Sequence, residues 1–179
     1  VQSECIPPAI KGKDVLCEND SKGKTSSFVI STLQILEPID GNSSILVLVP
    51  SREMACAAVE EYQRFSKYLK PVKICELVGG VPIKKNVKFL QKECPHIIVG
   101  TPIRIVELIK NGALKIDKIQ QLVLDGCDRM IGETNMRNAI RKIFESTARQ
   151  KQILSYGVTN NKTKQILQDY AKRSPLNCR

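Results

Sequence analysis

The sequence predicts an α/β fold in which a mostly parallel β-sheet lies between two layers of helices. Short β-rich runs alternate with amphipathic stretches from one end of the chain to the other. The run at 45–49 (ILVLV) is apolar throughout, as a parallel strand covered on both faces requires. Alternating strand and helix patterns without tandem repeats favour parallel strands joined by helical crossovers. We expect the 179 residues to form a single domain over 1–179.

Each expected element follows from a local pattern. Strands are expected at 14–17, 45–49, 72–78, 96–99, 121–125 and 152–155. Helices are expected at 25–36, 50–68, 83–91, 102–111, 135–146 and 162–172. Ligand sites of such sheets lie at the carboxyl ends of the strands, and each polar cluster considered below directly follows a strand.

Composition narrows the class of protein. The formal net charge of +10 favours polyanionic partners, and aromatic residues at 4% suit contacts with a sugar-phosphate backbone better than base stacking. No apolar run is long enough to span a bilayer, and no segment directs secretion, so we expect an intracellular protein. The seven scattered cysteines form no CxxC pair. We interpret them as small buried hydrophobic residues and expect neither a zinc site nor disulfides.

Residues 18–25 (ENDSKGKT) contain the closing half of a phosphate-binding P-loop. In such a loop, Ser21, Lys22 and Gly23 bind phosphates at a helix N-terminus, Lys24 neutralises their charge, and Thr25 ligates Mg²⁺. The alternative is an ordinary strand-to-helix turn that carries a lysine. The opening half departs from the pattern, because residue 18 is glutamate where a small residue is usual, Ser21 replaces a glycine, and residue 20 is acidic.

The run 121–125 (QLVLD) has the form of a Walker B strand. Asp125 is the expected partner of Thr25 in holding Mg²⁺, although a carboxylate at a strand end can also be a simple cap. Hydrolysis further needs a carboxylate that orients or deprotonates water, and the next residue is Gly126, which lacks one. Glu133 is near in sequence, but sequence supplies no geometry that assigns it this role.

Residues 125–128 (DGCD) resemble the Asp-Glu-Cys-Asp form of the DEAD motif with its glutamate lost. Further segments are similar to motifs of the DEAD-box RNA helicases in the same order: 1–7 (VQSECIP) to the end of the Q motif, 50–55 (PSREMA) to PTRELA, 79–80 to GG and 101–104 (TPIR) to TPGR. Residues 61–68 and 94–102, with the cysteine of the DGCD segment, resemble the subgroup that acts in pre-mRNA splicing and mRNA export. The resemblance covers nearly the whole chain and implies an N-terminal RecA-like P-loop domain.

The resemblance implies roles for particular residues. Gln2 matches the residue that reads adenine, and Asp125 and Asp128 belong to the catalytic set. The expected contacts with an RNA backbone are Ser51, Arg52, Gly79, Gly80, Thr101 and Arg104. Without the resemblance, the favoured interpretation of Arg52 and Arg104 is that they are plain surface arginines near helix starts. ATP and Mg²⁺ are the implied cofactors, RNA and proteins of mRNA export or splicing the implied partners, and the nucleus the implied location.

The departures from the family pattern lie where the chemistry occurs. Gly126 replaces the catalytic glutamate, residues 157–159 (GVT) replace Ser-Ala-Thr, and Ile103 replaces the glycine of TPGR. The second RecA-like domain that unwinding requires is expected to be absent. We therefore expect an ATP-binding helicase domain with impaired hydrolysis; an inactive RNA- or protein-binding module and an unrelated P-loop NTPase are the alternatives.

Overall fold

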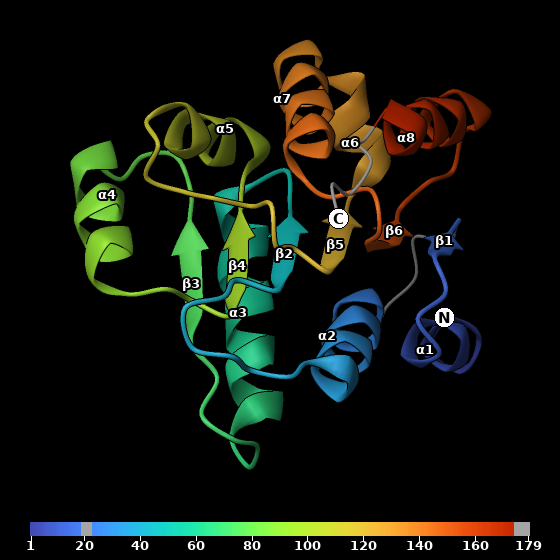
Figure 1. Ribbon diagram of the computed structural model, residues 1–179. Helices are drawn as coiled ribbons and strands as arrows, with labels where there is room; N and C mark the ends of the chain where they lie inside the picture. The colour runs from blue at the N-terminus through green and yellow to red at the C-terminus, as the bar shows by residue number, and fades with distance from the viewer. Residues whose placement is uncertain (19–22, 174–179) are drawn as a thin grey trace.

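Six parallel strands form the centre of the molecule in the order β1-β6-β5-β2-β4-β3. A computed structural model describes residues 1–18 and 23–173 (Figure 1). The strands are β1 (Val15–Cys17), β2 (Ile45–Leu48), β3 (Ile74–Leu77), β4 (Ile97–Gly100), β5 (Gln121–Asp125) and β6 (Gln152–Tyr156). Every paired neighbour is parallel, so all the carboxyl ends meet at one edge of the sheet.

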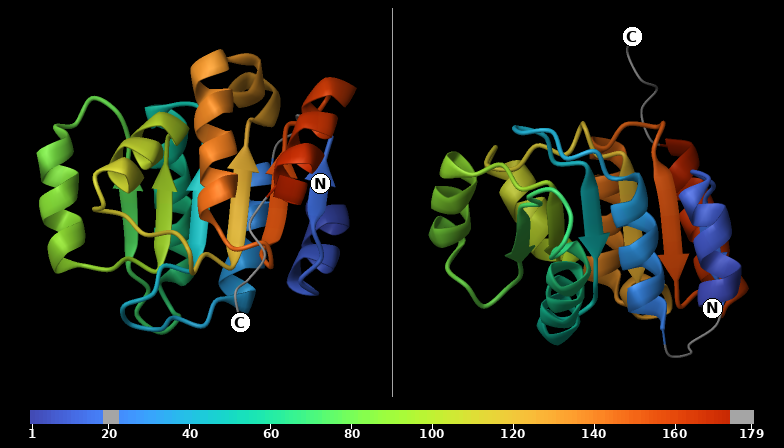
Figure 2. Two further views of the ribbon diagram at one scale, coloured as in Figure 1. Left: turned by 45° about the horizontal axis from the view of Figure 1, so that its top comes forward. Right: turned by 90° about the horizontal axis from the view of Figure 1, so that it is seen from below.

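Helices cover both faces of this sheet (Figure 2). They are α1 (Gln2–Ile10), α2 (Lys24–Ile35), α3 (Arg52–Ser66), α4 (Ile83–Lys92), α5 (Pro102–Lys110), α6 (Cys127–Gly132), α7 (Thr134–Ser146) and α8 (Asn161–Arg173). The core consists of two clusters because successive side chains of a strand point to opposite faces. Along β2, Ile45 and Val47 pack against α1, α2 and α3, whereas Leu46 and Leu48 pack in the cluster that contains α5, α6 and α7. The predicted three-layer α/β/α class is confirmed.

The expected elements are present with ends displaced by a residue or two in most cases, but two helices were not expected. Helix α1 contains Pro7 and Pro8, which normally interrupt a helix because proline lacks a backbone N–H. It forms here because Cys5 and Ala9 are buried against the sheet and α2. Helix α6 is a short turn of six residues that directly follows β5. Tertiary packing therefore determines both helices.

The burial of the cysteines varies more than expected. Cys5, Cys17, Cys75 and Cys127 are buried, but Cys56 is exposed on α3, so the interpretation of all cysteines as buried residues is wrong for this position. None of the six cysteines in the described part of the chain forms a disulfide, and Cys178 lies outside the described residues. No helix in the described parts of the chain is long and apolar enough to cross a membrane.

Candidate functional site

The register of the sheet brings the predicted nucleotide-binding segments to one edge. Cys17, Tyr156 and Asp125 lie in one row across β1, β6 and β5. Cys17 directly precedes the P-loop segment, Tyr156 directly precedes the 157–159 segment, and Asp125 is the first residue of the DGCD segment. Three segments that are far apart in sequence thus leave the sheet side by side, as expected for parallel strands.

Gly23 forms the N-cap of α2 and has a φ of 95°, a conformation that favours glycine. A side chain at this position would come within 3.3 Å of the Gln2 Nε2 atom. The amide of Gln2 therefore lies next to Gly23, the last glycine of the predicted P-loop segment. Lys24 and Thr25 occupy the first turn of α2, and the helix N-terminus presents N–H groups there. Ser21 and Lys22 lie outside the described residues.

The carboxylate of Glu18 was expected to oppose phosphate binding. In the structure, Glu18 is exposed and its Oε1 lies 3.6 Å from the Lys164 Nζ on α8. This ion pair offsets part of its negative charge, although an exposed pair contributes little stability. The acidic residue at position 20 lies outside the described residues.

The two aspartates of the DGCD segment differ in surroundings. Asp125 is buried at the end of β5, with 4% of its surface exposed. Asp128 accepts hydrogen bonds from the Thr159 backbone N–H (2.7 Å), the Thr159 hydroxyl and the Asn160 side-chain amide (2.8 Å). Burial acts to raise the pKa of the Asp128 carboxyl, but hydrogen bonds from residues 159, 160 and 163 outweigh it and lower that pKa. The carboxylate thus fixes the 157–159 segment to α6.

The cysteine of this segment is buried in the core. Burial raises the pKa of the Cys127 thiol to about 12, so the thiol stays protonated. Its Sγ donates to the Leu124 carbonyl at 3.5 Å. Cys127 is therefore a packing residue under the nucleotide site.

The backbone at position 126, where the resembled motif has glutamate, is closely packed. Gly126 has a φ of 82°, and a Cβ atom there would lie 3.2 Å from the Pro50 Cγ. Gly157 also has a positive φ of 71°, and a Cβ atom on it would lie 3.4 Å from the Gly126 Cα. Two departures from the family pattern, Gly126 and Gly157, thus lie next to each other. Glu133 cannot replace the lost base while it caps α7, because its carboxylate accepts hydrogen bonds from the Asn135 and Met136 N–H groups at 3.0 and 2.7 Å.

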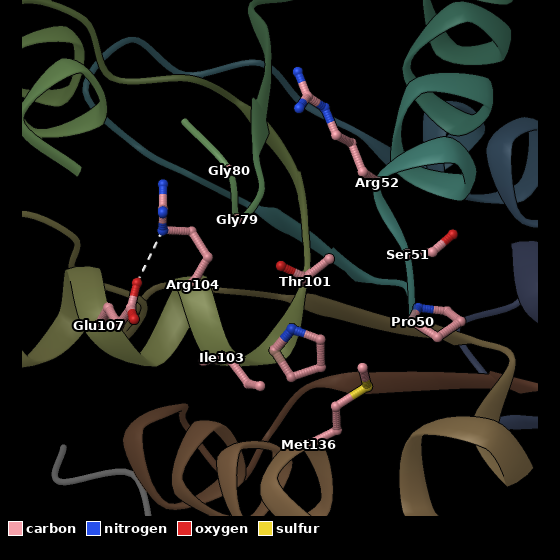
Figure 3. A pocket seen from close by; sticks show the side chains of 11 residues that line it. Pro50, Ser51, Arg52, Gly79, Gly80, Thr101, Ile103, Arg104, Glu107 and Met136 are labelled. Carbon is pink, nitrogen blue, oxygen red and sulfur yellow. Dashed lines mark hydrogen bonds and ion pairs between the residues drawn. The ribbon is translucent and has the colours of Figure 1, made fainter. Parts of the chain in front are cut away.

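A separate cavity of about 430 Å³ lies at the same edge of the sheet, over β2, β4 and β3 (Figure 3). All six residues predicted to contact an RNA backbone line it: Ser51, Arg52, Gly79, Gly80, Thr101 and Arg104. They come from three segments that follow three different strands. The cavity lies at the start of α3 and of α5, where helix N-terminal N–H groups suit anions.

The two arginines of the cavity differ in solvent exposure and in hydrogen bonding. Arg52 is exposed, and a side chain on Gly80 would come within 3.3 Å of its Nη1. Arg104 is only 8% exposed; its Nε donates to Glu107 at 2.9 Å and its Nη1 to the Asn86 Oδ1 at 2.6 Å. The interpretation of Arg104 as a plain surface arginine is therefore wrong. Figure 3 shows both side chains at the cavity, with the Arg104–Glu107 pair on the α5 side.

Sequence reasoning did not identify Asn86, Glu107 and Met136 as parts of this site. Asn86 had a detectable signal, because it lies on the apolar face of α4 with Ile83, Val87 and Leu90. A polar residue at such a position needs a buried partner. Glu107 has a weaker signal, its spacing of three residues from Arg104. For Met136, on the distant helix α7, no local pattern indicates a role.

The sequence profile of the DEAD/DEAH box helicases matches residues 1–166. The chain belongs to the DEAD/DEAH box helicase family. The resemblance drawn from the ordered motifs is confirmed.

Curated relatives agree with this assignment. The helicase domain is 44% identical over 163 residues to the human ATP-dependent RNA helicase DDX39A, covering 90% of this chain and 38% of the relative. It is also 44% identical over 163 residues to the DEAD-box ATP-dependent RNA helicase 56 of Oryza sativa subsp. japonica, covering 90% of this chain and 38% of the relative. The chain thus spans little more than a third of the length of these relatives.

Solved structures support the fold of the helicase domain. An ATP-dependent RNA helicase from Sulfolobus tokodaii, described as hypothetical, superposes with a TM-score of 0.80 at 22% identity, covering 98% of this chain and 50% of the other. Saccharomyces cerevisiae Dbp5, in a complex with Nup159, Gle1, IP6 and ADP, superposes with a TM-score of 0.84 at 21% identity, covering 98% of this chain and 46% of the other. At these identities the likeness establishes the RecA-like fold.

Proposed function

We propose that this chain is the ATP- and RNA-binding core domain of a DEAD-box RNA helicase, with impaired ATP hydrolysis. The observation that carries the proposal is the convergence of six residues from three motif segments on one cavity at the carboxyl edge of the sheet. Phosphate contacts that fix an RNA strand require N–H donors, hydroxyls and an arginine in this kind of setting. Arg52 supplies the cation, and Thr101 and Ser51 supply hydroxyls.

RNA binding is tested by the salt dependence of affinity. For a strand held by phosphate contacts, the logarithm of the binding constant falls linearly with the logarithm of the salt concentration. The slope is about −0.7 per neutralised phosphate for single strands. We expect Arg52→Ala to weaken binding of a uridine oligomer and to reduce the magnitude of this slope by about 0.7. Arg64→Ala is the matched control, because Arg64 is exposed on the same helix and pairs with Glu61. Absence of binding at low salt contradicts the proposed function.

The residues at the nucleotide edge fit ATP and Mg²⁺. Gln2 suits the adenine edge, Lys24 the phosphates, and Thr25 with Asp125 the metal ion. When bound, ATP with Mg²⁺ supplies the phosphoryl chemistry that a helicase uses. The contribution of this chain is to bind and orient the nucleotide at the N-terminus of α2.

Nucleotide binding is tested by calorimetry with ATP and Mg²⁺. We expect saturable heat in the unchanged protein and none in Lys24→Ala, because the lysine neutralises phosphate charge. Lys162→Ala is a suitable control, since Lys162 is exposed at the start of α8. Equal heats for both variants contradict a role for Lys24.

An inactive binding module is the second candidate, and the packing around Gly126 favours it. The position of the general base has no side chain, and Pro50 and Gly157 occupy the space beside it. Such a module keeps the RNA cavity but does not turn over ATP. Calorimetry separates the two candidates, because the helicase core binds ATP and the pure binding module does not.

Cellular context is part of the same proposal. By resemblance, we infer partners among the proteins of mRNA export or splicing and a nuclear location. A tagged chain that remains outside the nucleus, or that recovers none of these proteins from nuclear extract, contradicts this inference without affecting RNA binding.

A further inference from the structure

The RNA cavity alone supplies little positive charge. Its lining contains three charged side chains, and two of them, Arg104 and Glu107, form an ion pair with each other. Within the described chain, Arg52 forms no ion pair and is the single uncompensated cation of the cavity. Additional cations along the strand's path are therefore needed for firm binding of a polyanion.

Arg104 connects the cavity to α4. Its Nη1 donates to the side-chain oxygen of Asn86 in the first half of α4, and both side chains are buried. Helix α4 starts three residues after Gly80, which also lines the cavity. The bond holds the Asn86 side of α4 against α5, so the opposite side of α4 is the exposed one. Arg104 is in this sense a positioning residue.

The exposed face of α4 is basic and carries one aromatic ring. Lys85, Lys88, Phe89 and Lys92 have the spacing i, i+3, i+4, i+7, which places them on one side of a helix. All four side chains are exposed, with Phe89 40% exposed. The three lysines form no ion pair with another described residue. We call these four residues the α4 face; from Lys85 to Lys92 it extends about 10 Å along the helix.

The surface that borders the cavity on the side of α3 is acidic. Arg52 also borders a hollow of about 480 Å³ that is lined by Glu53, Glu60 and Glu76 on α3 and β3. Helices α3 and α4 lie on opposite faces of the sheet beside β3 (Figure 2). A phosphate chain that leaves the cavity is repelled along α3 and attracted along α4.

From these observations we propose that the α4 face is an extension of the RNA site, on which lysines bind phosphates and the Phe89 ring stacks on a base. Single-strand sites commonly combine a basic track with aromatic side chains in this way. The inference rests on the proposed function, since the strand reaches α4 from the cavity. The extension lengthens the site without adding base-specific hydrogen bonds, so it favours single-stranded RNA of any sequence.

The test compares two uridine oligomers, of about five and about twelve nucleotides, within the range of single-strand sites. Changing Lys85, Lys88 and Lys92 together to Gln is expected to reduce the magnitude of the salt slope by up to about two for the longer oligomer and to leave the shorter one unchanged. The control triple changes Lys11, Lys13 and Lys67 to Gln, which removes the same charge from exposed positions outside the α4 face.

Stacking by Phe89 is expected to affect the affinity but not its salt dependence. Phe89→Ala is expected to weaken binding of the longer oligomer about tenfold with an unchanged salt slope, because stacking releases no counterions. Tyr68→Ala is the matched control, since Tyr68 is exposed just after the end of α3, beside Lys67. Circular dichroism verifies that each variant is folded.

The possible failures are distinguishable. If Arg52→Ala weakens binding but the α4 variants behave like their controls, the extension is wrong and the proposed function stands. If the α4 variants weaken the short and long oligomers equally, the lysines act through general charge and the extension is also wrong. If the unchanged protein binds neither oligomer, the RNA-binding function fails, and this inference fails with it.

Discussion

Gly126 stands where the family motif carries its catalytic glutamate, and the backbone around it is adapted to glycine. A φ of 82° is costly for residues with a Cβ atom, by about 1–2 kcal/mol. The Pro50 ring would also lie within 3.2 Å of that atom. A side chain at position 126 thus requires a local change of the backbone. Position 126 therefore differs from the family motif in its backbone environment as well as in its lack of a carboxylate.

Gly126→Ala is therefore expected to lower the free energy of unfolding by about 1–2 kcal/mol, measured by urea denaturation. Gly132→Ala is the control, because Gly132 ends the same helix, has no positive φ, and would place its added Cβ atom in open space with nothing within 4 Å. The control is expected to be neutral or slightly stabilising. Equal effects at the two positions contradict a special backbone requirement at Gly126.

At the scale of elements, α7 begins with a carboxylate cap. Glu133→Ala removes the acceptor of two backbone N–H groups and is expected to cost about 1 kcal/mol in urea denaturation. Glu145→Ala, near the end of the same helix, is expected to cost less, because Glu145 and Arg141 form an exposed ion pair at 3.8 Å. The Glu133 variant also tests chemistry: since Glu133 is a cap, its loss is expected to leave any residual ATP hydrolysis unchanged.

The amino ends of β3 and β4 are joined through His96. Its Nδ1 accepts a hydrogen bond from the Lys73 backbone N–H at 2.9 Å, so the ring is neutral in the folded state. Burial lowers the pKa of His96, while Asp40, 3.8 Å from its Nε2, opposes part of this shift. Lys73, whose side chain pairs with Glu93, adds to the lowering.

A lowered folded-state pKa means that the unfolded chain binds the proton more readily. The contribution of His96 to stability is therefore complete above the ordinary value of about 6.5 and is lost as the pH falls through the lower folded value. Urea denaturation between about pH 7.5 and pH 5.5 is expected to show this loss, and His96→Asn is expected to flatten it. His96 is the only histidine of the chain, so its ring can be titrated by NMR without ambiguity. A pKa above about 6.5 contradicts the prediction.

At the scale of the whole molecule, the proposed impairment of ATP hydrolysis rests on the absence of a carboxylate at position 126. When the chain is joined to the second domain of a DEAD-box relative, we expect hydrolysis about 10²–10⁴-fold slower than in that relative, the usual effect of a missing general base. The comparison is made as RNA-stimulated phosphate release, with Lys24→Ala as the background. Rates equal to those of the relative contradict the impairment.

Gly126→Glu in the same joined protein distinguishes a missing carboxylate from a wider change. Because the Glu side chain meets the strained backbone and Pro50, we expect it to recover only part of the rate. Changing Gly157 to Ser as well tests whether the contact between the two glycines limits recovery. Full recovery by Gly126→Glu alone shows that the carboxylate is the single defect.

The fold class and the residues of the cavity proposed to bind RNA follow from sequence patterns. Continuous apolar strands such as 45–49 require cover on both faces, and parallel strand ends gather at one edge, so motifs that follow β2, β3 and β4 must meet. Six predicted contact residues line one cavity for this reason. The same rule brings Gly23 and Asp125 to one edge, with β6 between their strands.

The use of particular side chains depends on three-dimensional packing. Helix α1 forms despite Pro7 and Pro8 because packing against α2 outweighs local propensity. Arg104 donates to the Asn86 side chain on α4, a contact between residues 18 positions apart that spacing in the sequence could not establish. Sequence patterns report which faces are apolar and which strand ends coincide, whereas the partner of a polar group depends on three-dimensional packing.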